Sequence, residues 1–302
     1  MCIVNATILP LLRPFHQSLE PLLKAYRVGL RAGDTEFAIN SAMAYSLVYM
    51  CIGLPLGPLE PDVISFGKEA VQFGLSYSVV AMFEIFRQTI LNLQTDVETP
   101  TVLCGDAMDQ EKMLSNLEGN ARAMTLRDIS TFQLILACIY GDLDTAEKMF
   151  EASDLSSGSD MSLPRVHLRR TYHGLAAFML GHRRGKKKYL ALGRKIMKEV
   201  RSYVKLGSVN EHPILLMLEA EESLSIASYD AAIKACARSG LVHHVAYMNE
   251  RAGIHLLEKN DEREAEFYLT RAMELYEDWG LSGASSNRRH IFKAASPNSH
   301  AR

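Results

Sequence analysis

Residues 260–280, NDEREAEFYLTRAMELYEDWG, decide the fold class of this chain. Asn260 is suited to a left-handed turn that ends one helix, and Asp261 is suited to cap the free amides of the next. Ala265 follows four positions after the aspartate, and Glu264 follows it by three, which is the spacing of a capping box. The stretch therefore predicts a tight turn and the start of a closely packed helix.

Apolar residues continue along one face of this predicted helix. Tyr268, Ala272, Leu275 and Trp279 follow one another at spacings of four, three and four. Trp279 is the only tryptophan in the chain, so it is a candidate for a ligand site or for packing. Packing is the favoured interpretation, because burial of an indole contributes on the order of 3 kcal/mol without any ligand. Gly280 is then expected to end the helix.

The same turn, aspartate and alanine pattern occurs twice more, as GDTEFA at residues 33–38 and GDLDTA at residues 141–146. A small alanine lets a neighbouring helix approach closely. In the last copy Gly253 lies twelve residues and Leu256 nine residues before Ala265, which is the spacing of a tetratricopeptide unit. Apolar residues recur at helical spacing and no strand pattern is evident. We expect an all-α fold, a degenerate tetratricopeptide-like array of helical hairpins that forms an α-solenoid.

Composition narrows the class of protein. The chain has 302 residues, of which 48% are hydrophobic, and a formal net charge of -2, so neither nucleic acid nor an anionic membrane is favoured by overall charge. Its five cysteines contain no C-x-x-C pair, which favours a reducing, cytoplasmic location. Residues 37–59 carry no charge and raise the question of a membrane span, but Asn40 and a Gly/Pro-rich end favour a buried helix.

Two long stretches resemble a known family. They are EHPILLMLEAEESLSIASYDAAIKACARSGLVHHVAYMNERAGIHLLEKNDEREAEFYLTRAMELYEDWG at 211–280 and YRVGLRAGDTEFAINSAMAYSLVYMCIGLPLGPLE at 26–60, together with Gln88, Asn92, Leu93 and Leu103 to Gly105. Both resemble the tetratricopeptide-like helical region of large signalling proteins that combine an AAA/STAND ATPase, a serine/threonine kinase, a GAF domain and a histidine kinase.

This resemblance implies a helical domain over residues 26–280, with an N-terminal segment at 1–25 and a flexible tail at 281–302. It also implies a transmission or scaffolding role in signal transduction. The chain departs from the family between Glu221 and Tyr229, where a helical turn is missing, and after Gly280. It contains none of the catalytic segments of those proteins, so their activities do not transfer.

Motifs for catalysis are absent from the sequence. There is no G-x-x-x-x-G-K-[ST], G-x-G-x-x-G, H-R-D or G-x-S-x-G, so we expect no enzyme activity and no cofactor. A metal site at His243, His244 and His255 is disfavoured, because adjacent residues on a helix point about 100° apart. An acid/base group at Glu219, Glu221 and Glu222 is also disfavoured, since a solvated helix face explains these three nearby acids better.

A basic amphipathic helix is predicted over residues 182–205. This stretch holds ten lysines and arginines against one acid, Glu199. Its expected apolar stripe is Tyr189, Leu192, Ile196, Val200 and Tyr203. The candidate partner-binding residues of its basic face are Arg183, Arg184, Lys186, Lys187, Lys188, Arg194, Lys195 and Lys198.

Several roles for this face stay open. A packed repeat helix with solvated charges is favoured, followed by a calmodulin-like groove, an anionic lipid surface and a nucleic-acid contact. The basic face has no aromatic residue for base stacking, so we expect no nucleic-acid partner. We also expect no transmembrane segment. Residues 258–278 contain eight acids against three bases, so a charged partner or a second copy is an alternative.

The preferred functional hypothesis is a non-catalytic helical-repeat module that binds a protein or peptide partner or acts as a scaffold. The alternative is a fragment of a larger kinase or ATPase signalling protein whose catalytic domains lie outside this chain. A third hypothesis is a membrane-surface protein that uses residues 182–205.

Overall fold

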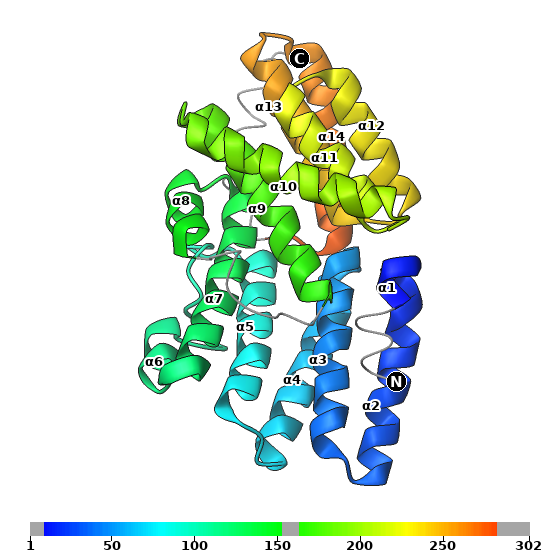
Figure 1. Cartoon of the computed structure of the whole chain (residues 1–302). Helices are drawn as coiled ribbons and strands as arrows, with labels where there is room; N and C mark the ends of the chain where they lie inside the picture. Colours follow the sequence, from blue (N-terminus) through cyan, green and yellow to red (C-terminus); the bar gives the residue numbers. More distant parts are fainter. Residues whose placement is uncertain (1–8, 153–162, 283–302) are drawn as a thin grey trace, which may run out of the picture.

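The computed structural model describes residues 9–152 and 163–282, and it confirms an all-α fold (Figure 1). In the described residues the only β-type pairing is an isolated bridge between Cys104 and Asp109. The helices are α1 (Leu9–Leu12), η2 (Phe15–Ser18), α2 (Leu19–Ala32), α3 (Thr35–Ile52), α4 (Leu56–Gln72), α5 (Tyr77–Gln94), α6 (Gln110–Ser115), α7 (Gly119–Tyr140), α8 (Leu143–Ala152), α9 (Leu163–Arg183), α10 (Lys187–Lys205), α11 (Glu211–Ser223), α12 (Ile226–Arg238), α13 (Val242–Glu258) and α14 (Glu262–Trp279).

Helices that follow one another in the chain pack as neighbouring pairs. These pairs are α2 with α3, α4 with α5, α7 with α8, α9 with α10, α11 with α12, and α13 with α14. The three copies of the sequence pattern lie in the first, third and last of these pairs, and pairs without the pattern lie between them. Helix pairs therefore also form where the pattern is absent.

Each pattern aspartate caps the second helix of its pair. A side-chain oxygen accepts a hydrogen bond from the amide three residues later, at 3.1 Å for Asp34, 3.0 Å for Asp142 and 3.2 Å for Asp261. The residue before each aspartate is left-handed, with φ of 76° at Gly33 and 61° at Asn260. These contacts are local in the chain, which is why the sequence predicts them correctly.

The pattern alanines Ala38, Ala146 and Ala265 are completely buried. In the first pair, a Cβ on Gly29 would lie 3.0 Å from the Cβ of Ala38. In the last pair, a Cβ on Gly253 would lie 2.5 Å from a side-chain carbon of Leu269. Small residues on both helices therefore allow the close approach that the sequence predicts.

The stripe of α14 also lies where it was predicted. Tyr268, Ala272, Leu275 and Trp279 are all buried, and Gly280 ends the helix in the left-handed conformation with φ of 95°. Trp279 is 4% exposed and packs against the ring of His243, with 5.3 Å between ring centroids. The packing interpretation is thus confirmed.

The last helix pair rests against the beginning of the chain. Gly53, which ends α3, lies against His243 so closely that a Cβ there would be 1.8 Å from Nδ1. After α14, the hydroxyl of Ser282 donates to the carbonyl of Gln94 at 2.7 Å. Asn210, before α11, donates to the carbonyls of Pro10 and Arg13. We call this meeting of distant segments the terminal junction.

The described residues before position 26 pack with the helices that follow. The domain start expected at residue 26 falls inside α2, and the preceding Phe15 and Leu22 are buried in the core. The connection after α3 is short, since α4 begins at Leu56. Pro58 lies in the first turn of α4, where a missing amide costs no intrahelical hydrogen bond. Leu281 is buried, and the rest of the expected flexible tail, residues 283–302, lies outside the described residues.

The uncharged stretch at 37–59 is divided between two helices. It forms most of α3, which buries apolar and small residues on all sides, and then turns at Gly53 with φ of 63°. Within the described part of the chain, no helix is long and apolar enough to cross a membrane.

Candidate functional site

The basic stretch predicted as one helix over residues 182–205 is divided: α9 ends at Arg183, the chain turns at Gly185 with φ of 65°, and α10 begins at Lys187. In α10, Tyr189, Ile196 and Val200 are buried as predicted, whereas Leu192 is 39% exposed and Tyr203 is half-buried. Gly193, next to Leu192, faces α9. A Cβ on Gly193 would lie 3.0 Å from the ring of Phe178, so a larger residue there would require this ring to shift.

Five of the eight predicted cations form ion pairs with acids from other helices. Arg184, Lys186 and Lys188 pair with α8 through Asp144, Glu147 and Glu151 respectively. Arg194 lies 2.6 Å from Glu222 of α11, and Arg183 lies 2.5 Å from Glu258 of α13. These exposed pairs each contribute about 0–1 kcal/mol, and they neutralise much of the expected basic face.

The other three predicted cations, Lys187, Lys195 and Lys198, are exposed and make no ion pair with the described residues. Lys205 at the end of α10 shares this property. At 100° per residue the four lysines fall within an arc of about 80° on one side of the helix. They extend over about 27 Å of the helix axis. We call this row the lysine stripe.

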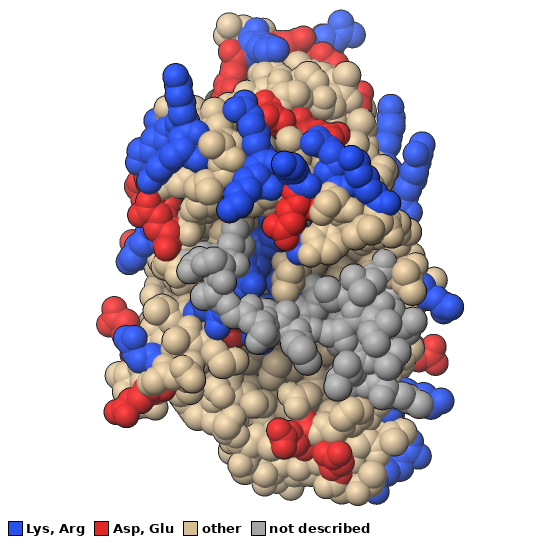
Figure 2. Space-filling view, in the orientation of Figure 1, with Lys and Arg blue, Asp and Glu red and all other residues tan. Residues whose placement is uncertain are grey.

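Figure 2 shows where charge gathers on the surface. Lys and Arg side chains crowd the band of the molecule that α10 crosses in Figure 1, and acidic side chains lie among them. The ion pairs explain this mixture. The free charge of the band therefore lies on the lysine stripe and not on the whole predicted face.

Of the three histidines considered for a metal site, one lies apart from the other two. His255 packs beside Tyr229, whereas His243 and His244 belong to the terminal junction. Contrary to the expectation from helical geometry, the rings of His243 and His244 do meet, stacked with 3.8 Å between centroids. Across residues 9–152 and 163–282, no group of three or more His, Cys, Asp or Glu side chains is placed to hold a metal ion.

The stacked pair is neutral at physiological pH. Neither ring nitrogen of His243 or His244 has a hydrogen-bond partner among the described residues. Burial lowers the pKa of His243 to about 3, and burial together with His243 lowers the pKa of His244 well below its usual value. The aromatic neighbours are Trp279 and, at 6.1 Å from His244, Tyr172. The two imidazole rings therefore contribute to the packing of the core.

The three acids considered as an acid/base group point to different partners. Glu219 pairs with Arg201, and Glu222 pairs with Arg194. Glu221 is completely buried, and both its oxygens accept hydrogen bonds from Arg251, at 2.8 and 2.9 Å. They therefore do not converge on one reacting atom.

Comparison with known proteins finds no match to this chain. No family model matches this chain, and neither curated proteins nor solved structures contain a match. The resemblance to signalling proteins stays a prediction, and function must be argued from the surface and cavities of the chain itself.

Proposed function

We propose that this chain is a non-catalytic, tetratricopeptide-like repeat module that binds an acidic protein segment along the lysine stripe of α10. The observation that carries the proposal is uncompensated charge. Lys187, Lys195, Lys198 and Lys205 lack acidic partners among the described residues, although most cations around them have one. An acidic segment would supply the missing counter-charge.

The stripe is held on a rigid support. Tyr189, Ile196 and Val200 anchor α10 from below, and the hydroxyl of Tyr189 donates to both Glu147 and Glu151 of α8, at 2.8 and 3.0 Å. The stripe therefore needs little ordering of the backbone when a partner binds, which favours affinity.

A protein partner fits this surface better than a nucleic acid. The two tyrosines of α10 are not available for base stacking, since Tyr189 is 1% exposed and Tyr203 lies under the guanidinium of Arg170, 4.4 Å from its ring centre. Without aromatic rings for stacking, the stripe offers a nucleic acid only charge contacts with its phosphates. A row of lysines over about 27 Å suits an acidic helix or extended segment of similar length.

Buried thiols support a non-catalytic role. Cys51, Cys138 and Cys236 are buried, and burial raises the pKa of each thiol, to about 12 for Cys236. A thiol becomes a nucleophile only as a thiolate, so these cysteines are not suited to covalent catalysis at neutral pH. The resemblance to the helical region of signalling proteins supports a scaffolding role for the module.

Selection from a displayed peptide library tests the proposal. We expect enrichment of acidic peptides whose affinity falls with added salt, as screened charge contacts require. The Lys195→Glu/Lys198→Glu variant should bind the selected peptides at least about tenfold more weakly, because two attractive contacts become repulsive.

The matched control is Lys24→Glu/Arg27→Glu, which makes the same change in net charge on exposed positions of α2. This control should bind as the wild type does. If the library yields no acidic peptides, or if both double variants bind equally, the proposed surface is wrong.

A further inference from the structure

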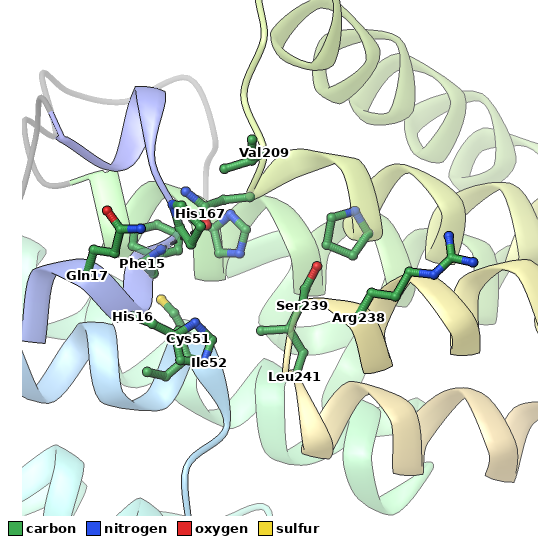
Figure 3. Close-up of a pocket in the computed structure, with 13 residues that line it drawn as sticks. Phe15, His16, Gln17, Cys51, Ile52, His167, Val209, Arg238, Ser239 and Leu241 are labelled. Atoms are coloured by element: carbon green, nitrogen blue, oxygen red, sulfur yellow. Dashed lines mark hydrogen bonds between the residues drawn. The ribbon is translucent and has the colours of Figure 1, made fainter.

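A cavity of about 360 Å³ opens at the terminal junction, on a different part of the molecule from the lysine stripe. Five separate stretches of the chain line it: residues 14–17, the end of α3, His167 of α9, the region that begins α11, and the connection from α12 to α13. Figure 3 shows residues from these stretches around one space, with His16, Cys51 and Ile52 on one side and Ser239 and Leu241 on another. Its volume is at the lower end of the range for small-molecule sites.

The walls are largely apolar. Phe15, Ile52, Pro213 and Leu241 line the cavity, and Phe15 packs edge-on against His167 with 5.0 Å between ring centroids. Such a lining favours an apolar ligand body, because contact with it removes apolar surface from water.

Two polar lining residues are already engaged within the protein. Asn210 accepts a hydrogen bond from the amide of Phe15 at 3.0 Å and donates to two carbonyls of the N-terminal segment. The thiol of Cys51 donates to the carbonyl of Pro164 at 3.4 Å, and burial raises its pKa well above the usual value. These two groups stabilise the walls of the cavity and do not offer a reactive atom to a ligand.

The remaining polar groups are neutral or basic. Gln17 and Ser239 line the cavity together with Arg238, His16 and His167, and none of its described lining residues is acidic. Arg238 is exposed and forms no ion pair with the described residues. Its guanidinium extends outward in Figure 3, which places fixed positive charge at the edge of the cavity and not in its depth.

His167 is oriented by a carboxylate behind it. Its Nδ1 lies 3.1 Å from Oε1 of Glu211, and Arg170 donates to the same oxygen at 2.9 Å. Burial raises the pKa of Glu211, but His167 and Arg170 lower it by more, so this carboxylate stays ionised. With Nδ1 engaged, Nε2 is the ring nitrogen of His167 that remains for a ligand in the cavity.

From this arrangement we propose that the cavity binds a small organic monocarboxylate with an apolar body. The carboxylate pairs with Arg238 at the edge, and the body lies against Phe15, Ile52 and Leu241. A cationic ligand is disfavoured because no acid lines the cavity. This inference goes beyond the proposed binding of an acidic protein segment and depends on different residues.

A ligand here would connect segments that are far apart in the chain. The cavity joins the N-terminal residues 14–17 to residues 238–241, so an occupied cavity stabilises the terminal junction. Ligands that bind only the folded state raise the melting temperature in proportion to the logarithm of their concentration.

Calorimetric titration and thermal unfolding with hexanoate and benzoate test the proposal, with hexanamide and benzamide as neutral counterparts of the same shape. We expect the carboxylates to bind and to raise the melting temperature, and the amides to bind about two- to fivefold more weakly, as loss of an exposed ion pair implies. Arg238→Gln should weaken carboxylate binding by a similar factor.

Lys234→Gln, about one turn earlier on the exposed side of α12, removes the same charge outside the cavity and should leave binding unchanged. Helical circular dichroism checks that both variants fold. The proposal is overturned if no carboxylate binds at millimolar concentration, if the amides bind as tightly, or if the two variants behave alike. The Lys195→Glu/Lys198→Glu variant should bind carboxylates normally, which separates this test from that of the lysine stripe.

Discussion

Lowering the pH should weaken the fold through the stacked histidines of α13. His243 and His244 are 4% and 2% exposed, and they are packed against each other, Trp279, Tyr172 and the backbone of Gly53. Their pKa values are lowered from 6.5, to about 3 for His243, chiefly by burial. In the unfolded chain both imidazoles bind protons below about pH 6.5, whereas in the folded chain they stay neutral.

The sign and size of the effect follow from this difference. Where the unfolded state binds more protons than the folded state, lowering the pH lowers the free energy of unfolding. This loss begins near the unfolded pKa and continues down to the folded pKa. At about pH 5 the pH is about 1.5 units below the unfolded pKa of His243 and still above its folded pKa, which corresponds to about 2 kcal/mol. The free energy of unfolding should therefore fall by about 2 kcal/mol through His243 between neutral pH and about pH 5, and His244 lowers it further in the same direction.

Urea denaturation followed by circular dichroism at both pH values measures this loss. The His243→Leu/His244→Leu variant should lose much less stability than the wild type between the two pH values, because its side chains do not titrate. His212→Gln removes an exposed histidine and serves as the control, with a loss equal to that of the wild type. Equal losses in the wild type and the double leucine variant would refute the reasoning.

Three further predictions concern packing and charge. Trp279→Ala should reduce the free energy of unfolding by about 3–5 kcal/mol, since it removes a buried indole from the terminal junction, and Trp279→Phe by less; urea denaturation measures both. Arg251→Ala should lower the free energy of unfolding by about 3–5 kcal/mol in the same assay, because it leaves Glu221 buried without its partner. Replacing both residues by methionine should lower it by less. Equal losses in the two variants would contradict the ion-pair argument. Gly253→Ala should lower the free energy of unfolding by about 1–3 kcal/mol and lower the melting temperature, since its Cβ would overlap Leu269. An unchanged melting temperature would show that the two helices can move apart to accept the methyl group.

Local chemistry explains what could be predicted from the sequence alone. The left-handed residue, the capping aspartate and the buried alanine act within a few residues of one another, so the pattern at Asp34, Asp142 and Asp261 predicts helix starts correctly. Periodicity likewise predicts the buried face of α14 up to Trp279, because the helical repeat alone decides which side chains share a side.

The tertiary structure alone decides which charges are free and where a ligand could bind. Lys188 and Lys195 look equivalent in sequence, but α8 brings Glu151 within 3.0 Å of Lys188 and no described acid reaches Lys195. In the same way, the cavity exists because residues 14–17 meet residues 238–241. Such meetings depend on how whole helix pairs stack, a sum of many weak contacts between distant segments, and no short stretch of sequence contains that sum.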